Sequence, residues 1–80
     1  MSQHGSYSVV LTPEPEGGFT VRVPAFQEIV TYGVDEAEAM AMAREAIELS
    51  IEYRNSIGED LPESDQTILR NISIPLPSAA

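Results

Sequence analysis

The side chains that could perform acid–base or nucleophilic chemistry are few and scattered in this sequence. The single histidine, His4, stands in a polar N-terminal segment with no acid or metal co-ligand near it. General acid–base and metal sites need groups that converge from rigid elements, so we expect His4 to be a solvated tail residue. The serines have no histidine base beside them, and Gly17-Gly18 lacks the Lys-Ser/Thr of a phosphate-binding loop. We therefore expect no enzyme, no bound metal and no cofactor.

Carboxylates dominate the charge of the chain. Thirteen aspartates and glutamates stand against four arginines and no lysine, which gives a net charge of -9. Such a chain repels phosphate and has few cations with which to release counterions, so direct binding to nucleic acid is not expected. The balance instead favours a basic or uncharged partner.

Four of the glutamates are spaced to share one face of a helix, where they could dock a basic partner. They are Glu38, Glu45, Glu48 and Glu52. The alternative is an ordinary solvated face, on which Arg44 forms a weak i,i+4 pair with Glu48. On the outward face of the hairpin, Arg22 could contact a partner or simply interrupt an exposed sheet surface.

Alternating apolar residues predict three strands ahead of the long helix, at residues 7–11, 19–23 and 28–32. The glycine pair before the second strand predicts a hairpin, and Pro24 ends that strand because proline cannot donate to the ladder. A two-metal nuclease site would need several carboxylates on strands, and these three strands offer only Glu28.

A D-x-x-E start predicts the helix, since Asp35 can cap it and Glu38 can complete a capping box. The helix is expected over residues 36–56, with Gly58 ending it. Residues 67–74 return to period two and predict a fourth strand. Its apolar face would carry Ile68, Ile72 and Ile74. The predicted fold is α+β, of order β-β-β-α-β, with a largely antiparallel four-stranded sheet packed on one long helix.

Eighty residues predict a single domain, residues 1–80, with a flexible tail at 1–5 and a C-terminal tail at 75–80. A domain of this size buries only about 60–65% of its unfolded surface, so a second subunit would add stability. The apolar arc of the helix covers about 200°, although packing on one sheet needs little more than about 100°. The part of the arc that the sheet does not need could be alanine and methionine side chains at the border with solvent. Alternatively it could be an interface, and we then expect a homodimer or homotetramer. The interface candidates are Val10, Met40, Met42, Leu49 and Tyr53.

Cysteine is absent, which is compatible with a reducing compartment. The sequence contains neither a signal-peptide pattern nor an apolar run of about 18 residues that could span a bilayer. We expect a cytoplasmic protein without a membrane partner.

Three motifs together resemble the HicB-like antitoxin family: a GG-aromatic-x-V-x-V-P strand, a T-x-G helix entrance and an A-R-E-A-I-E-L helix body. The residues that carry the resemblance are Gly17, Gly18, Phe19, Val21, Val23, Pro24, Thr31, Gly33, Glu36, Ala37, Ala43, Arg44, Glu45, Ala46, Ile47 and Leu49. One departure is the turn at Phe26-Gln27-Glu28, which lacks the proline and glycine that the family has there.

The resemblance implies a partial ribonuclease H-like domain that neutralises a small basic HicA-like ribonuclease by covering its active site. It also implies a short form without the DNA-binding domain that many relatives carry, so that operator binding is not expected. The alternative is a solitary oligomeric module, regulatory or binding a small ligand, that has no cognate toxin.

Overall fold

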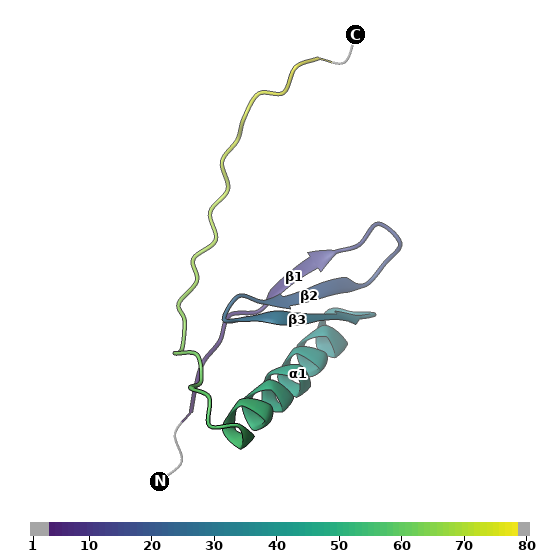
Figure 1. Ribbon diagram of the computed structural model, residues 1–80. Coiled ribbons are helices and arrows are strands. Elements are labelled where there is room, and N and C mark those ends of the chain that lie inside the picture. The colour runs from purple at the N-terminus through teal and green to yellow at the C-terminus, as the bar shows by residue number, and fades with distance from the viewer. Residues whose placement is uncertain (1–3, 79–80) are drawn as a thin grey trace.

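A three-stranded antiparallel sheet is covered on one face by a single long helix in the computed structural model, which describes residues 4–78 (Figure 1). The elements are β1 (Val10–Pro13), β2 (Phe19–Val23), β3 (Phe26–Gly33) and α1 (Glu36–Ser56). The strands lie in the order β1-β2-β3, so each pairs with its neighbour in sequence. The predicted α+β class and the order of these four elements are confirmed.

The β1–β2 hairpin turns through the glycine pair. Gly17 and Gly18 have φ angles of 104° and 77°, in the left-handed region that glycine adopts at little cost. The N–H of Glu14 donates to the Gly18 carbonyl at 3.0 Å and closes the turn. The hairpin predicted from these glycines is confirmed.

Pro24 determines where β1 and β2 stop pairing. Because proline has no N–H, β2 ends at Val23. Val10 pairs with Arg22, so only Val23 remains on β2 to pair with the residues that precede Val10. The strand β1 therefore begins later than predicted. The turn into β3 is short: Val23 pairs with Phe26 after an irregularity in the register, and β3 therefore begins earlier than predicted.

The helix α1 has the predicted bounds, and side chains cap its start. Asp35 Oδ1 accepts the N–H of Glu38 at 2.8 Å, while Glu38 Oε1 accepts the N–H of Val34 at 3.1 Å. The second bond reaches one residue before the N-cap, a variant of the predicted capping box. At the other end Gly58 has a φ of 73° and follows the C-cap Ile57.

Six buried apolar residues form the core between the sheet and α1. They are Val21, Val23, Phe26, Ile29, Ala39 and Ala43. Ala39 and Ala43 lie one turn apart on the helix and pack against Val21, so the small side chains bring α1 close to the sheet. Phe26 meets the ring of Tyr7 edge to face, with centroids 4.9 Å apart.

The fourth strand predicted at residues 67–74 is wrong for the described chain, and the sheet has three strands. Residues 66–78 are exposed and run away from the body as an extended segment (Figure 1). The residue pattern is that of a strand, but a strand exists only where a neighbour pairs with it. The exposed segment also begins well before the predicted tail at residue 75. The last two residues of that tail, and the first three of the N-terminal tail, lie outside the described residues. The wider likeness to ribonuclease H stays a prediction.

Candidate partner-binding surfaces

The four predicted glutamates all lie exposed on α1, within one face of the helix. Glu38 is engaged in capping, whereas Glu45 and Glu52 extend from the middle of that face. Arg44 approaches Glu48 at 3.8 Å as predicted, but the side chains are 82% and 66% exposed. An exposed pair of this kind contributes little to stability, so it leaves Glu48 free to exchange partners.

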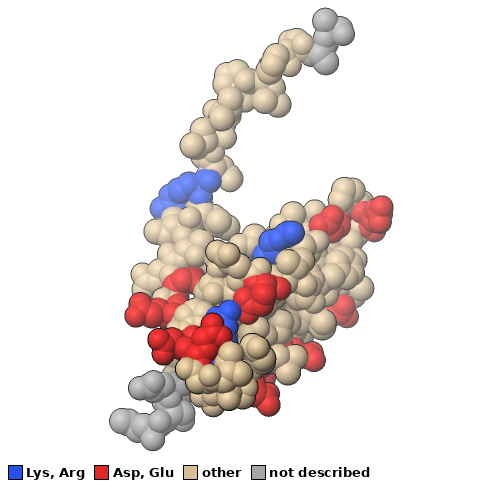
Figure 2. Space-filling view, in the orientation of Figure 1, with Lys and Arg blue, Asp and Glu red and all other residues tan. Residues whose placement is uncertain are grey.

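Figure 2 shows acidic side chains spread over the body of the molecule and none along the extended C-terminal segment. All thirteen aspartates and glutamates precede residue 66 in the sequence. The negative potential therefore belongs to the body, and the helix face is one part of it.

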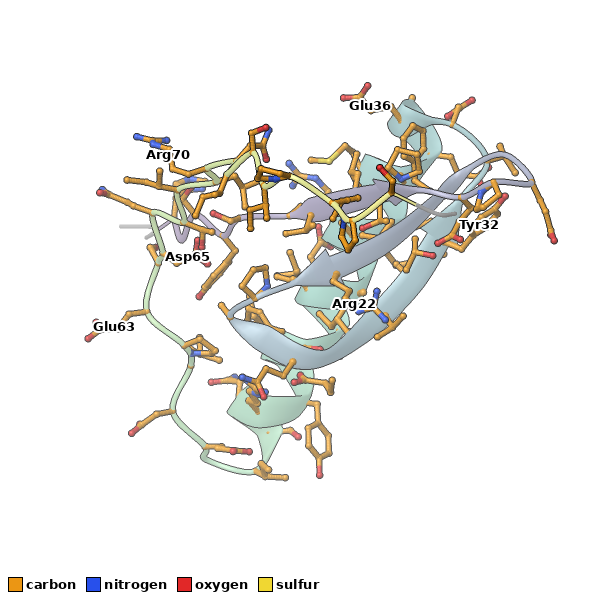
Figure 3. All side chains as sticks on the ribbon, turned by 90° about the horizontal axis from the view of Figure 1, so that it is seen from above. Arg22, Tyr32, Glu36, Glu63, Asp65 and Arg70 are labelled. Carbon is orange, nitrogen blue, oxygen red and sulfur yellow. The ribbon has the colours of Figure 1, made fainter. Side chains whose placement is uncertain are left out.

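Arg22 lies on the other side of the sheet from α1. Arg22 is on β2, where it pairs with Val10 of β1 on one side and with Val30 of β3 on the other. The three side chains form one row across the sheet, on the face away from the helix. Figure 3 shows Arg22 projecting from this open face. Arg22 and the glutamates of α1 thus lie on opposite faces of the molecule.

Four of the five predicted interface residues are distributed over three surfaces, and the fifth, Met42, is half-buried on α1 and lines none of them. Met40 lines a groove between α1 and the chain before β1, whereas Leu49 and Tyr53 line a hollow on the β3 side of the helix. Val10 lines a third hollow on the open face of the sheet, beside Arg22. The wide apolar arc of the helix therefore consists of two flanks, one on each side of the sheet contact.

Sequence reasoning missed an ion pair that ties the end of α1 to β3. Arg54 Nη2 donates to both carboxylate oxygens of Glu28 at 3.0 Å, and its guanidinium carbon lies 4.8 Å above the centroid of the Phe26 ring. The Arg54 side chain is only 19% exposed. The sequence gives one hint of this pair, because Glu28 is the lone carboxylate of the predicted strands. That hint does not identify Arg54 as the partner of Glu28.

A second unpredicted feature is the junction at which the C-terminal segment leaves the body. The N–H of Asp65 donates to the Ser6 carbonyl at 3.1 Å, and the Asp65 carboxylate accepts the N–H of Ser8 at 3.1 and 3.3 Å. Tyr7 adds a hydrogen bond from its hydroxyl to the Pro62 carbonyl at 2.7 Å. Figure 3 shows Asp65 at this crossing.

Hydrogen bonds at the junction lower the pKa of Asp65 below its ordinary value. The largest contribution is the side chain of Ser8, and the backbone N–H groups of Ser8 and Thr67 add to it. These donors favour the ionised carboxylate, so the junction gains stability above the ordinary pKa of 3.8 and loses it as the pH falls through the lowered pKa.

We predict that the Ser8 amide is protected from hydrogen exchange at neutral pH and becomes unprotected as the solution is acidified below about pH 3.8. The physical reason is protonation of the carboxylate that accepts it. An Asp65→Ala variant should show low protection at every pH. A wild-type amide whose protection does not change with pH would contradict the assignment.

The described residues offer little for cofactor or metal chemistry. Within residues 4–78, no three His, Cys, Asp or Glu side chains converge in a way that could hold a metal ion. His4 is exposed. In the same part of the chain, no helix has the length and apolar character needed to cross a bilayer.

Comparison with known proteins agrees with the sequence motifs. No family model matches the chain. Over 56 residues it is 38% identical to the proteins named Antitoxin HicB of Escherichia coli K12 and Escherichia coli O157:H7. The aligned region is 70% of this chain but 41% of each relative, so the chain spans about two fifths of the length of the curated relatives it matches. Over the greater part of its length, this chain is HicB-like in sequence.

Proposed function

We propose that this chain is an antitoxin that binds a small basic HicA-like toxin and covers the site with which the toxin cleaves mRNA. The observation that carries the proposal is the 38% identity to Antitoxin HicB over 70% of the chain. The net charge of -9 supports it, because an RNA-cleaving protein must present a cationic surface to its substrate.

The exposed glutamates of α1 provide a physical route to inhibition. Glu45, Glu48 and Glu52 hold their charges exposed on one face of a helix. An acidic face that occupies the cationic surface of the toxin attracts it at long range and excludes RNA by competing for the same charges. Inhibition of this kind needs no chemical step.

The proposal is tested by coexpressing the chain with a small basic HicA-like toxin. We expect the pair to copurify and cell growth to be restored in proportion to the antitoxin made. Undiminished toxicity, together with failure to copurify, would contradict an antitoxin function.

A charge-neutralising variant tests the helix face itself. With Glu45→Gln, Glu48→Gln and Glu52→Gln combined, we expect affinity for the toxin to fall about tenfold, because each exposed pair contributes up to about 1 kcal/mol. Most of the loss should appear as slower association, and it should shrink in high salt. The measurement is binding kinetics on the purified proteins.

A matched control removes the same number of charges from the loop that follows α1. Its substitutions are Glu59→Gln, Asp60→Asn and Glu63→Gln. We expect the control to weaken binding by no more than about twofold, as for charges outside a contact. Equal losses from the two variants would show that net charge, and not the helix face, determines binding.

A further inference from the structure

Residues 67–76, which we name the C-terminal arm, expose an unusual amount of apolar surface. Five large apolar side chains of the arm are 67–84% exposed: Ile68, Leu69, Ile72, Ile74 and Leu76. Among residues 4–78, the only hydrogen bond that extends beyond Thr67 is local, from Arg70 to the Leu69 carbonyl at 3.1 Å. Figure 1 shows the arm running away from both sheet and helix. A contiguous exposed apolar segment of this kind indicates an interaction site.

The residue pattern of the arm is that of a strand. Residues 68, 72 and 74 are isoleucines on one face, while Thr67, Asn71 and Ser73 lie on the other. The extended arm already has a strand-like backbone but lacks a neighbour to pair with. Such a segment can become a strand by pairing with an open sheet edge that has an apolar surface beside it.

The free edge of β1 is an open sheet edge with an apolar surface beside it. In the order β1-β2-β3, the part of the chain that the structure describes gives β1 a neighbour on one side only, so its outer N–H and C=O groups are available for pairing. A groove of about 520 Å³ lies next to this edge, between α1 and the chain leading into β1. Its apolar lining includes Val9, Met40, Ala43, Ile47 and Ile51. A strand added to the β1 edge would direct alternate side chains into this groove.

The chain begins to follow this edge itself and then leaves it. At the junction, Asp65 donates its N–H to Ser6 and accepts the N–H of Ser8, which reproduces one rung of a parallel ladder. The acceptor, however, is the Asp65 carboxylate in place of the backbone carbonyl, and beyond Thr67 the arm diverges. The edge at Val10–Pro13 therefore stays uncovered by its own arm.

The charge of the arm indicates whether it binds a second copy of this chain or a basic protein. The arm has a single charged residue, Arg70, on the same face as the isoleucines, and all acidic residues of the chain precede it. Glu48, on the lining of the groove, offers that arginine a carboxylate. An apolar arm with one cation complements the acidic body of this same chain better than it complements a basic toxin.

We propose that two copies of this chain exchange arms, each arm adding a strand to the β1 edge of the other copy with its isoleucines in that copy's groove. Reciprocal exchange satisfies both edges through one two-fold contact. It supplies the neighbour that residues 67–74 lack in a single copy. The inference is independent of the proposed toxin, since the exchange needs no other protein.

The first test is the mass of the purified full chain by light scattering at micromolar concentration. We expect twice the chain mass of 8.7 kDa for the wild type and the single chain mass for Ile72→Asp. Ser73→Asp adds the same charge to the opposite face of the arm and should remain dimeric. Because Ile72 is 82% exposed, its substitution should leave the circular dichroism spectrum of the body unchanged.

The second test uses the absence of cysteine to place the arm. Chains carrying Ile72→Cys are mixed with chains carrying Met40→Cys in the groove, and the mixture is oxidised. We expect a disulfide-linked pair, and a much lower yield when Leu49→Cys, on the other flank of α1, replaces Met40→Cys. A monomeric wild type would overturn the proposal, as would a dimer that survives Ile72→Asp or equal linkage to both positions.

Discussion

Replacing Phe26 with alanine is expected to destabilise the fold by about 3–5 kcal/mol, the usual range for a fully buried aromatic residue. Phe26 is 0% exposed and is the largest fully buried side chain. Its ring also meets the ring of Tyr7 in a T-shaped arrangement and lies beneath the guanidinium of Arg54. The substitution leaves a cavity and removes both aromatic contacts. Small domains have only about 5–15 kcal/mol of total stability, so the variant should lose a large fraction of it and unfold at a markedly lower urea concentration.

Urea unfolding followed by circular dichroism measures this loss. Val30→Ala is the matched control, because Val30 lies on the same strand but is 58% exposed. We expect the control to change stability by no more than about 0.5 kcal/mol. If the two variants unfolded at the same urea concentration, Phe26 would not be the centre of the core.

Replacing Gly33 with alanine is the second substitution for which we expect a large effect, of about 1–3 kcal/mol or more. A Cβ placed on Gly33 would lie 2.3 Å from the backbone nitrogen of Ala39 and 2.4 Å from its Cα. Backbone atoms of α1 cannot turn aside as a flexible side chain could. The helix would have to move away from the end of β3 and lose its contact with Val21.

Gly58→Ala is the control for this experiment. A Cβ at Gly58 meets nothing within 4 Å, so the cost there is only that of a left-handed backbone, about 1–2 kcal/mol. The measurement is the thermal midpoint of each variant, together with the Val21 and Ala39 amide shifts by NMR. We expect these shifts to change in Gly33→Ala and to stay unchanged in Gly58→Ala. An unperturbed helix contact in Gly33→Ala would contradict the close approach of α1 to β3.

Elements with a local cause could be predicted from the sequence. The bounds of α1 follow from Asp35 at one end and Gly58 at the other, and those of β2 follow from the glycine pair and Pro24. All of these signals act within a few residues of the boundary that they set. The predicted ends of β1 and β3 were less accurate, because pairing with β2 determines them.

Features that depend on distant residues were not predictable in the same way. Residues 67–74 have the composition of a strand, but only a paired neighbour makes a strand, and the described single chain has none there. The Arg54–Glu28 pair joins residues far apart in sequence, so spacing could not reveal it. The glutamates of α1 were grouped correctly because helix periodicity alone places them on one face.

The residues proposed for an oligomer interface illustrate the same limit. Helix periodicity placed Met40 and Leu49 in one broad apolar arc, yet the sheet divides that arc into two flanks. Helix periodicity shows which residues share one side of a helix, but not which part of that side the sheet covers. The groove beside β1 is formed by α1 together with the chain before β1, two segments that are distant in sequence, so helix periodicity could not predict it.

The proposed inhibition by occlusion is tested most directly by titrating RNA cleavage by a HicA-like toxin with the purified protein. Occlusion predicts that cleavage falls linearly to zero at a fixed molar ratio and that both proteins are recovered intact from the complex. Cleavage that persists in a large excess of this protein, with no complex detected, would contradict the proposed function.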